Sequence, residues 1–453
     1  MIKRSLKQIA EMAGLNYTGP DAEVSGISID SRHISEGNLF VPFRGEHADG
    51  HVYVEKAIES GAAASFWQKD VPNPPMHLPI LLVDDTLEAL QRLAEAYLRQ
   101  TQAKVVGITG SNGKTTTKDM TASLLSQQYK VHKTGGNFNN HLGMPLTILA
   151  MDEDTEIVIL EMGMSGRGEI ELLSKLARPD VAVITNVGEA HLLDLGSREA
   201  IAEAKLEITA GLKENGVLIY HGDEPLLSNK MQNKTFVTHT FGRADTNDIY
   251  AEYIETAGVG TIFKTNLYEE QLELPILGNH NVLNAMAAIL VARVFNVSPE
   301  QIKTGLLQLK ITNMRMEMLE GKNGEKIIND AYNASPTSMN AAIELVSSLT
   351  GFRHKILVLG DMLELGEEEV QYHEKIGESI SKNDIDCVFT YGKLGKHIAN
   401  GAEKAIGKAN VRAFEDKAKL VEELKHFAGK GDLILVKASR GMKLEEIVQA
   451  LSK

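Results

Sequence analysis

The chain has 453 residues, 43% hydrophobic and 24% charged, which is the usual balance of a soluble globular protein. Its net charge of −14 argues against nucleic-acid binding, and no stretch approaches the roughly 20 apolar residues of a membrane helix. Residues 1–20 hold no uninterrupted apolar segment of a signal peptide, and the single Cys387 excludes an internal disulfide, so we expect a cytoplasmic protein without membrane insertion.

The order of predicted strands and helices divides the chain into three α/β domains. Residues 1–100 mix short strands, such as 38–43, with helices, such as 87–99, and form a small N-terminal α/β domain. Residues 101–312 alternate apolar strands with helices, which predicts a parallel sheet covered on both faces. Its strands are 105–109, 156–161 and 181–185, and its helices are 114–127, 169–176 and 198–212.

A second alternating series begins near residue 313 and predicts a Rossmann-like C-terminal α/β domain over residues 313–453. Its predicted strands are 326–329, 355–359, 387–391 and 433–437.

A glycine-rich turn joins the predicted strand 105–109 to the helix that begins at Lys114. It reads Thr109-Gly-Ser-Asn-Gly-Lys-Thr-Thr-Thr117. Glycines allow backbone amides to point inward, and the helix N-terminus adds positive potential, so the turn suits phosphate. Lys114 would reach the β- and γ-phosphates of a nucleoside triphosphate, and the Thr115 hydroxyl would bind magnesium. The usual first glycine is replaced by Ile108, so the loop is a shortened variant. The alternative is a glycine turn that only caps a helix.

This loop resembles that of the Mur ligases and of folylpolyglutamate synthases. Further segments follow in the family's order, namely Glu161-Met-Gly163, Thr185-Asn-Val-Gly-Glu-Ala-His191, Gly278-Asn-His-Asn-Val-Leu-Asn284, Arg315, Asp330-Ala-Tyr-Asn-Ala-Ser-Pro336 and Gly360-Asp-Met-Leu-Glu-Leu-Gly366. The resemblance runs nearly end to end, and the last two segments favour the branch of the family that uses D-alanyl-D-alanine. It implies a UDP-substrate domain, a central ATP-binding P-loop domain and a C-terminal ligase domain.

The resemblance implies an ATP- and Mg²⁺-dependent amide ligase of peptidoglycan precursor synthesis, and we expect the protein to be a monomer. ATP would phosphorylate the terminal carboxylate of UDP-N-acetylmuramoyl-tripeptide, and the amine of D-alanyl-D-alanine would attack the acyl phosphate. Two alternatives stay open. One is a sibling Mur or folylpolyglutamate-type ligase with another amine acceptor, and the other is a nucleotide-switched P-loop regulatory protein, because a fold alone does not fix a function.

The resemblance also implies which residues bind ATP. Asn281 and Asn284 would approach the adenine, although asparagines before an apolar helix are also typical N-caps. Asp330 would bind the ribose, or it only caps the helix that starts near Pro336. The full set predicted for ATP is Thr109, Gly110, Ser111, Asn112, Gly113, Lys114, Thr115, Thr116, Asn281, Asn284, Arg315 and Asp330.

Candidate catalytic and metal-binding residues come from the same motifs. Glu161 would bind magnesium, since hard cations prefer carboxylate oxygen, and the alternative is a solvated acid at a strand end. His191 would serve a second metal, or it is a hydrogen-bonding surface histidine. Lys205 would carry a carbamate, or it is an exposed lysine that pairs with glutamates along its helix. Arg315, at the second domain boundary, would stabilise the transferring phosphoryl group or is a surface linker residue. The catalytic set is Lys114, His191, Lys205 and Arg315, and the metal set is Thr115, Glu161 and His191.

Substrate contacts are predicted in all three domains. The turn-rich segment 134–140 would lie near the uridine nucleotide, although tight turning alone would explain its composition. Residues 30–32 and 45–51 resemble further uridine-nucleotide contacts. In the last domain we single out Asp361, Glu364, His373, Lys437, Ser439 and Arg440, with a helix N-cap as the alternative for Ser439. The substrate set is Ser31, Arg32, Asn137, Asn140, Asn333, Ser439 and Arg440.

Overall fold

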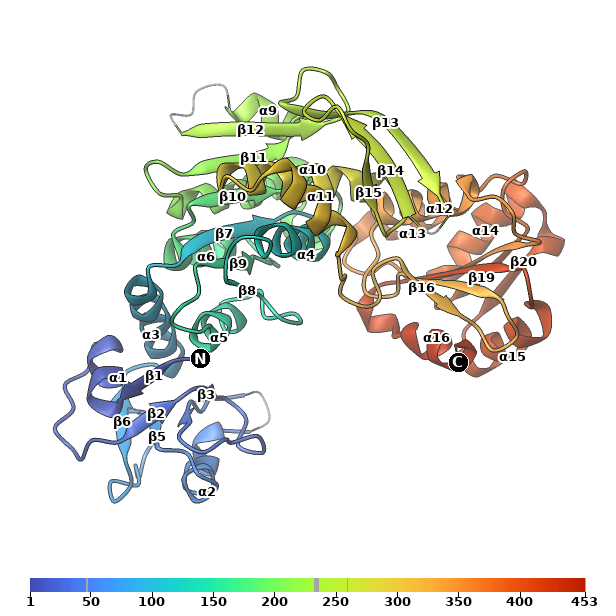
Figure 1. The fold of residues 1–453 in the computed structure, drawn as a ribbon. Helices are drawn as coiled ribbons and strands as arrows, with labels where there is room; N and C mark the ends of the chain where they lie inside the picture. Colours follow the sequence, from blue (N-terminus) through green and yellow to red (C-terminus); the bar gives the residue numbers. More distant parts are fainter. Residues whose placement is uncertain (46–47, 232–235, 259, 453) are drawn as a thin grey trace.

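The chain folds into three bodies that follow one another along an arc, with the N-terminal body at the lower left and the C-terminal body at the right of Figure 1. The computed structural model describes residues 1–45, 48–231, 236–258 and 260–452. The α/β fold class is confirmed.

The N-terminal body combines a short antiparallel pair with a small parallel sheet. Strands β1 (Lys3–Ser5) and β2 (Glu23–Ser25) pair antiparallel. The parallel sheet has the order β3 (Ile27–Ser28), β4 (Leu39–Phe40), β5 (Ala64–Gln68) and β6 (Ile80–Val83), and the helices are α1 (Leu6–Met12), α2 (Val54–Glu59) and α3 (Thr86–Thr101). The strand predicted over residues 38–43 is wrong beyond its first half, because Pro42 has no N–H to donate to a sheet.

The central body is built on a nine-stranded sheet. Its parallel part has the order β8 (Val131–Lys133), β9 (Ile157–Glu161), β7 (Lys104–Thr109), β10 (Val181–Ile184), β11 (Val217–His221), β12 (Val237–Gly242) and β13 (Ile249–Ala257). The strands β14 (Gly260–Thr265) and β15 (Leu272–Leu274) extend it antiparallel, a feature that the sequence patterns did not predict.

Helices cover both faces of this sheet, as predicted for continuous apolar strands. Val106 and Ile108 of β7 face the core formed with α4 (Lys114–Leu125), α10 (Asn279–Val294) and α11 (Pro299–Leu307). Val105 faces the opposite core, which is shared with the N-terminal body. The helices on that side include α5 (Gly143–Ala150), α6 (Glu169–Ala177) and α8 (Arg198–Leu206), while α7 (Leu192–Leu195) and α9 (Pro225–Met231) are short connections. The predicted helix 198–212 continues after α8 only as the 3-10 turn Glu207–Gly211.

The C-terminal body holds a six-stranded sheet, and the four strands predicted there are confirmed. The order is β16 (Glu317–Glu320), β17 (Lys326–Asn329), β21 (Leu433–Lys437), β18 (Lys355–Gly360), β19 (Cys387–Tyr391) and β20 (Val411–Phe414), with only β16 antiparallel. Its helices are α12 (Pro336–Ser348), α13 (Glu369–Glu378), α14 (Gly395–Ile406), α15 (Lys417–Phe427) and α16 (Glu445–Leu451).

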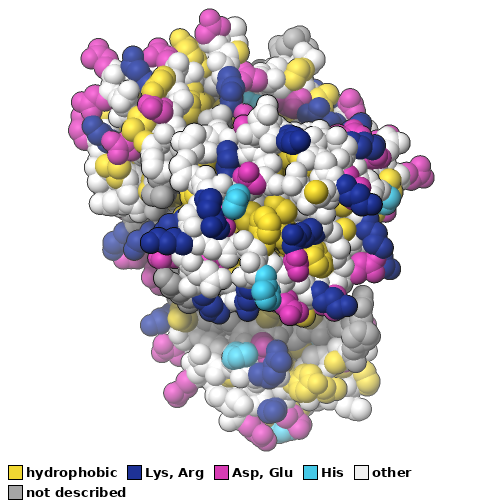
Figure 2. All heavy atoms as spheres, turned by 90° about the vertical axis from the view of Figure 1, so that its right-hand side faces the viewer, with side chains coloured by type: hydrophobic (Ala, Val, Ile, Leu, Met, Phe, Trp, Pro, Cys, Tyr) yellow, Lys and Arg dark blue, Asp and Glu magenta, His cyan; other side chains and the backbone are white. Residues whose placement is uncertain are grey.

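Charge is mixed rather than segregated on the face of the molecule drawn in Figure 2, where basic and acidic side chains alternate over the C-terminal side. Within the described part of the chain, no helix is both long and apolar enough to cross a lipid bilayer.

Candidate active site

The phosphate loop lies where the chain order of the central sheet reverses. Strand β7 has β9 on one side and β10 on the other, and the loop follows directly from the carboxyl end of β7. Ligands of doubly wound sheets bind at this point, because the loops on its two sides diverge and leave a crevice. The predicted strand, turn and helix are all present, so the turn meets the structural condition for a phosphate loop.

Two glycines of the loop are required by its geometry. Gly110 has φ +151°, and a Cβ atom there would lie 1.8 Å from the Thr185 hydroxyl oxygen. Gly113 has φ +79°, and its Cβ would lie 2.4 Å from Oδ1 of Asn284. Asn186, from the loop after β10, supports the turn: its carbonyl accepts from the N–H of Ser111 (3.1 Å) and its Oδ1 from the N–H of Asn112 (2.9 Å).

At the start of α4, where the loop ends, lie the ammonium of Lys114 and the hydroxyl of Thr115, and the carboxylate of Glu161 binds this hydroxyl. The ammonium of Lys114 donates to the carbonyl of Gly110 at 2.7 Å, and burial lowers the pKa of this lysine, with Glu161 opposing the shift. The Thr115 hydroxyl donates to Oε2 of Glu161 at 3.0 Å, and Asn139 donates to Oε1 at 2.9 Å. Glu161 is only 3% exposed, so the alternative of a solvated strand-end acid is wrong. A buried carboxylate with uncharged partners, next to a hydroxyl, fits a magnesium ion.

Lys205 and His191 lie close enough to Lys114 for their charges to interact. Lys205 is 1% exposed, so the alternative of an exposed lysine paired with glutamates is wrong. Burial, together with the charge of Lys114, lowers the pKa of Lys205 well below its ordinary value. His191 adopts a left-handed backbone (φ 65°), and its Nδ1 lies 2.9 Å from Oε2 of Glu364 in the C-terminal body. Burial and Lys114 lower the pKa of His191.

A cavity of about 380 Å³ opens beside the loop, between the central and C-terminal bodies. It is lined by nine of the residues singled out from the sequence, namely Asn112, Gly113, Thr116, Asn281, Asn284, Arg315, Asp330, Asn333 and Lys437. The helix behind it, α10, begins at Asn279, so Asn281 and Asn284 lie within its first turns and the N-cap alternative is wrong. Neither asparagine caps the helix, because the residue directly before α10 is Gly278. His280 also lines the cavity, and burial lowers its pKa to about 4, which keeps the ring neutral.

Arg315 reaches the site from the linker between the two bodies. Its guanidinium lies 4.1 Å from the ring centroid of Tyr332, and Nη2 lies 3.5 Å from the Thr115 hydroxyl oxygen. Arg315 is therefore not a surface linker residue. Arg440 lies 5.9 Å from the same ring and is ion-paired with Glu445 at 2.6 Å. The residue-type patterns did not single out Tyr332, which both arginines approach.

The C-terminal wall of the cavity contains a buried ion pair. Lys437 lies 2.5 Å from Oδ2 of Asp330 and donates to the carbonyl of Asn333 at 3.0 Å. Helix α12 is capped by Ser335, so the alternative of Asp330 as its cap is wrong. Ser335 donates to Oδ1 of Asn112 at 3.2 Å, a direct contact between the C-terminal body and the phosphate loop.

Other residues singled out in the last domain hold its loops. The N–H of Leu363 donates to Oγ of Ser439 at 2.9 Å, so this hydroxyl bridges two loops and does not cap a helix. His373 is fully buried, accepts from the N–H of Met362 (2.8 Å) and donates to the carbonyl of Glu369 (2.6 Å). These contacts give His373 and Ser439 a supporting role in the loop 361–366.

The segment 134–140 runs toward Glu161 but presents a different asparagine from the two that we predicted. Asn139 binds Glu161, whereas Asn137 is exposed and Oδ1 of Asn140 accepts from the N–H of Gly143 at 2.8 Å. Asn140 thus has a capping role at the start of α5. No pattern of residue types distinguishes Asn139 from the two neighbouring asparagines.

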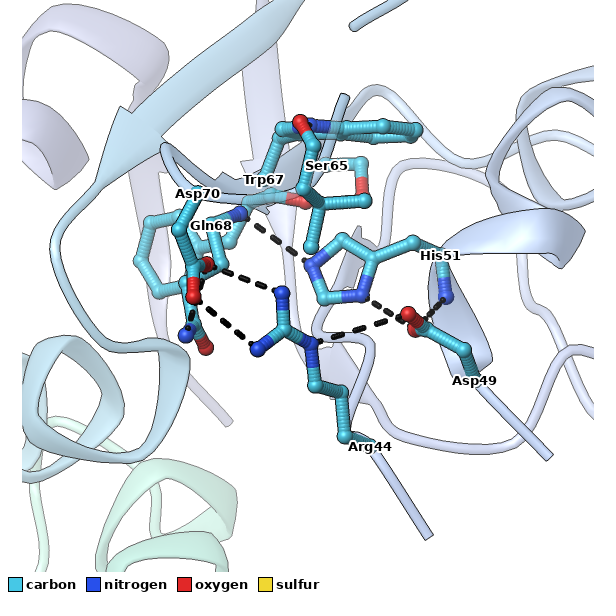
Figure 3. A network of polar contacts seen from close by, with 9 residues as sticks. Arg44, Asp49, His51, Ser65, Trp67, Gln68 and Asp70 are labelled. Carbon is cyan, nitrogen blue, oxygen red and sulfur yellow. Dashed lines mark hydrogen bonds and ion pairs between the residues drawn. The ribbon is translucent and has the colours of Figure 1, made fainter. Parts of the chain in front are cut away.

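The substrate contacts predicted in the N-terminal domain lie in the first body, outside the cavity. The Arg32 side chain is 79% exposed and pairs with Asp30 at 2.8 Å, next to Ser31. A second polar group (Figure 3) centres on the buried His51, whose Nδ1 lies 2.6 Å from Asp49 and whose Nε2 accepts from the N–H of Gln68 at 3.1 Å. Of the segment 45–51, residues 46 and 47 lie outside the described residues.

Comparison with known proteins accounts for all three bodies. The family model described as "Mur ligase family, catalytic domain" matches residues 23–98, "Mur ligase middle domain" matches residues 108–292, and "Mur ligase, glutamate ligase domain" matches residues 314–440. A UDP-N-acetylmuramoyl-tripeptide–D-alanyl-D-alanine ligase of Bacillus subtilis is 56% identical over 100% of this chain and 99% of its own length.

Solved structures agree over the same length. A crystal structure of MurF from Acinetobacter baumannii superposes with a TM-score of 0.89 at 30% identity, covering 99% of this chain and 98% of that one. A MurF ligase from Thermotoga maritima, solved in complex with ADP, gives a TM-score of 0.83 at 32% identity, covering 94% and 96%.

Proposed function

This chain belongs to the Mur ligase family. From that premise we propose that the protein joins D-alanyl-D-alanine to UDP-N-acetylmuramoyl-tripeptide, and that the reaction takes place at the phosphate loop and the cavity beside it. It is an ATP-dependent ligase that forms a C–N bond in peptidoglycan precursor synthesis, with Mg²⁺ as the usual partner of the ATP. The observation that carries the assignment is the meeting of the phosphate loop and Arg315 at one cavity between two bodies, with Glu161 bound to the Thr115 hydroxyl of that loop.

The reaction consists of two transfers. The terminal carboxylate of the tripeptide attacks the γ-phosphorus of ATP, which yields an acyl phosphate and ADP. The amine of D-alanyl-D-alanine then attacks the acyl carbon, and phosphate leaves with the carboxylate oxygen. Phosphoryl transfer depends mainly on positioning and on stabilising charge, so fixed cations around the phosphates matter most.

We assign the roles of the protein groups from their positions. The amides of residues 110–115 and the ammonium of Lys114 hold the phosphates, and the guanidinium of Arg315 lies 3.5 Å from the Thr115 hydroxyl. Thr115 and Glu161, with His191 nearby, would hold Mg²⁺, which neutralises phosphate charge when bound. Asn281, Asn284 and Asp330 line the part of the cavity where the nucleoside would lie.

The division into 1–100, 101–312 and 313–453 is part of the proposal, with the UDP-substrate, ATP-binding and ligase roles assigned in that order. The four sheets support it, because the two small sheets lie in the first segment, the nine-stranded sheet in the second and the six-stranded sheet in the third. Ser31, Arg32, Asn137, Asn140, Asn333, Ser439 and Arg440 are the proposed substrate contacts. We also propose a cytoplasmic location, supported by the need for ATP and by the lone, buried cysteine, and we propose a monomer.

The function is tested by incubating the protein with ATP, Mg²⁺, each nucleotide-linked tripeptide and a panel of amines, and weighing the products by mass spectrometry. D-alanyl-D-alanine should give the product, and the single amino acids should give little. Preferential use of glutamate or of a single amino acid would assign the chain to a sibling reaction, and phosphate release at equal rate without any amine would exclude a ligase.

We propose that Lys205 is carbamylated, which turns a buried cation into an anion beside Lys114. Its lowered pKa favours the neutral amine, the form that attacks carbon dioxide. Lys205→Ala should lose about 100-fold or more in kcat, with partial recovery in short carboxylic acids. In ¹³C-bicarbonate, the wild-type protein should show a carbamate NMR signal that Lys205→Ala lacks. Identical spectra of the two proteins would refute the modification.

A further inference from the structure

The linker that carries Arg315 has an unusual backbone. Met314 and Met316, its two neighbours, both adopt left-handed conformations, with φ of 62° and 54°. Residues with side chains rarely adopt this region, and such conformations persist only where the surroundings hold them. The position of Arg315 therefore depends on contacts at both ends of the linker.

The C-terminal end of the linker is held by the C-terminal body itself. The N–H of Met316 donates to Oδ1 of Asp330 at 3.3 Å, and the N–H of Met314 donates to Oε2 of Glu317 at 3.1 Å. The guanidinium of Arg315 lies over the aromatic ring of Tyr332. These contacts fix Arg315 relative to the last body but not relative to the phosphate loop.

The N-terminal end is held by a different element. Oδ2 of Asp119 accepts both the backbone N–H of Thr312 (2.9 Å) and its hydroxyl (2.7 Å). Asp119 is 2% exposed and lies on α4, the helix that the phosphate loop opens and that carries Lys114. This contact ties the linker directly to the helix of the phosphate loop.

The negative charge of the buried Asp119 carboxylate is compensated by two lysines. Lys133 lies 2.6 Å from Oδ1 of Asp119, and Lys118, itself 2% exposed, lies 3.5 Å from the same atom. Burial alone would raise the pKa of Asp119, but Lys118 and Lys133 hold it below its ordinary value. Lys118 also donates to the carbonyl of Thr134 at 2.9 Å, where the segment 134–140 begins. The reaction described above uses none of these groups.

We propose that Asp119 is a positioning residue, which fixes Thr312 and thereby holds Arg315 at the phosphate loop through the strained linker. The inference deepens the proposed function and depends on it, because it assumes that Arg315 acts on the transferring phosphoryl group.

The mildest test removes one hydroxyl and leaves every buried charge paired. Thr312→Val should lower kcat about tenfold, with KM for ATP and for the nucleotide-tripeptide within about twofold. Thr312→Ser, which keeps the hydroxyl, should retain most of the activity. Thr304→Val is a matched control, because the exposed Thr304 hydroxyl only donates to the carbonyl of Glu300, one turn earlier in α11. In an Arg315→Ala background, Thr312→Val should cause no further loss of kcat.

The outcomes separate this inference from the proposed function. A lower melting temperature of Thr312→Val with unchanged kcat would make Asp119 merely structural, and an additive loss in the Arg315→Ala background would show that it does not act through Arg315. Either result overturns the inference alone. Full activity of Arg315→Ala would instead overturn the role proposed for that arginine.

Discussion

Replacing Lys114 by alanine should lower kcat/KM for the ligase reaction roughly 1,000-fold, because the variant loses the cation that the phosphate loop presents to the β- and γ-phosphates. The ammonium already lies within the loop, 2.7 Å from the carbonyl of Gly110, so the charge is positioned before the nucleotide arrives. A preorganised charge in a largely buried site stabilises developing charge more than one in water. Steady-state rates of ADP release and peptide formation, at saturating D-alanyl-D-alanine, measure the effect.

A control must separate this loss from misfolding. Lys130 is 66% exposed and pairs with Asp154 on the surface, so Lys130→Ala should keep full activity. The melting temperature of Lys114→Ala should stay close to that of the wild type, since no ion pair of the fold is lost. Turnover of a folded Lys114→Ala protein within a few-fold of the wild type would contradict the phosphate role of the loop.

Arg315→Ala should lower kcat about 100- to 1,000-fold while changing KM for ATP far less. The guanidinium is held over Tyr332 and beside the Thr115 hydroxyl, where it can meet charge that develops on the γ-phosphate. Arg315→Lys should recover little, because an ammonium lacks the planar shape that stacks on the ring and the paired N–H donors. Single-turnover measurements with saturating ATP isolate the chemical step.

The matching control for Arg315 is Arg99→Ala, an exposed arginine whose partner Glu95 lies one turn away on the same helix. That variant should behave like the wild-type protein. If Arg315→Ala raised KM for ATP and left kcat unchanged, the arginine would bind the ground state and transition state equally, and its catalytic role would be wrong.

The parts of the fold that depend on local pattern could be predicted from the sequence. The strand, turn and helix around Lys114 are encoded within about 20 residues, and their chemistry needs no distant partner. Strands β17, β19 and β21 were predicted to the residue, because buried parallel strands are continuous apolar runs. The antiparallel strands β14 and β15 were not predicted, since they do not continue the alternation of strand and helix.

Residues of the site could be predicted only where they belong to a recognisable sequence motif. Segment 134–140 holds three asparagines, and only the folded chain shows that Asn139 is the one that binds Glu161. The complete burial of Lys205 could not be predicted, because the helix predicted over residues 198–212 contains three glutamates that suggest an exposed face. The contact between Asp119 and Thr312 joins residues 193 positions apart, which spacing cannot reveal.

Oxygen labelling tests most directly whether ATP phosphorylates the carboxylate of the tripeptide before the amine attacks it. The terminal carboxylate of the nucleotide-linked tripeptide is labelled with ¹⁸O and incubated with the protein, ATP, Mg²⁺ and D-alanyl-D-alanine. Mass spectrometry of the released phosphate should find one ¹⁸O atom for each peptide bond formed, because the phosphoryl group leaves with a carboxylate oxygen. Peptide product accompanied by unlabelled phosphate would contradict the acyl phosphate route.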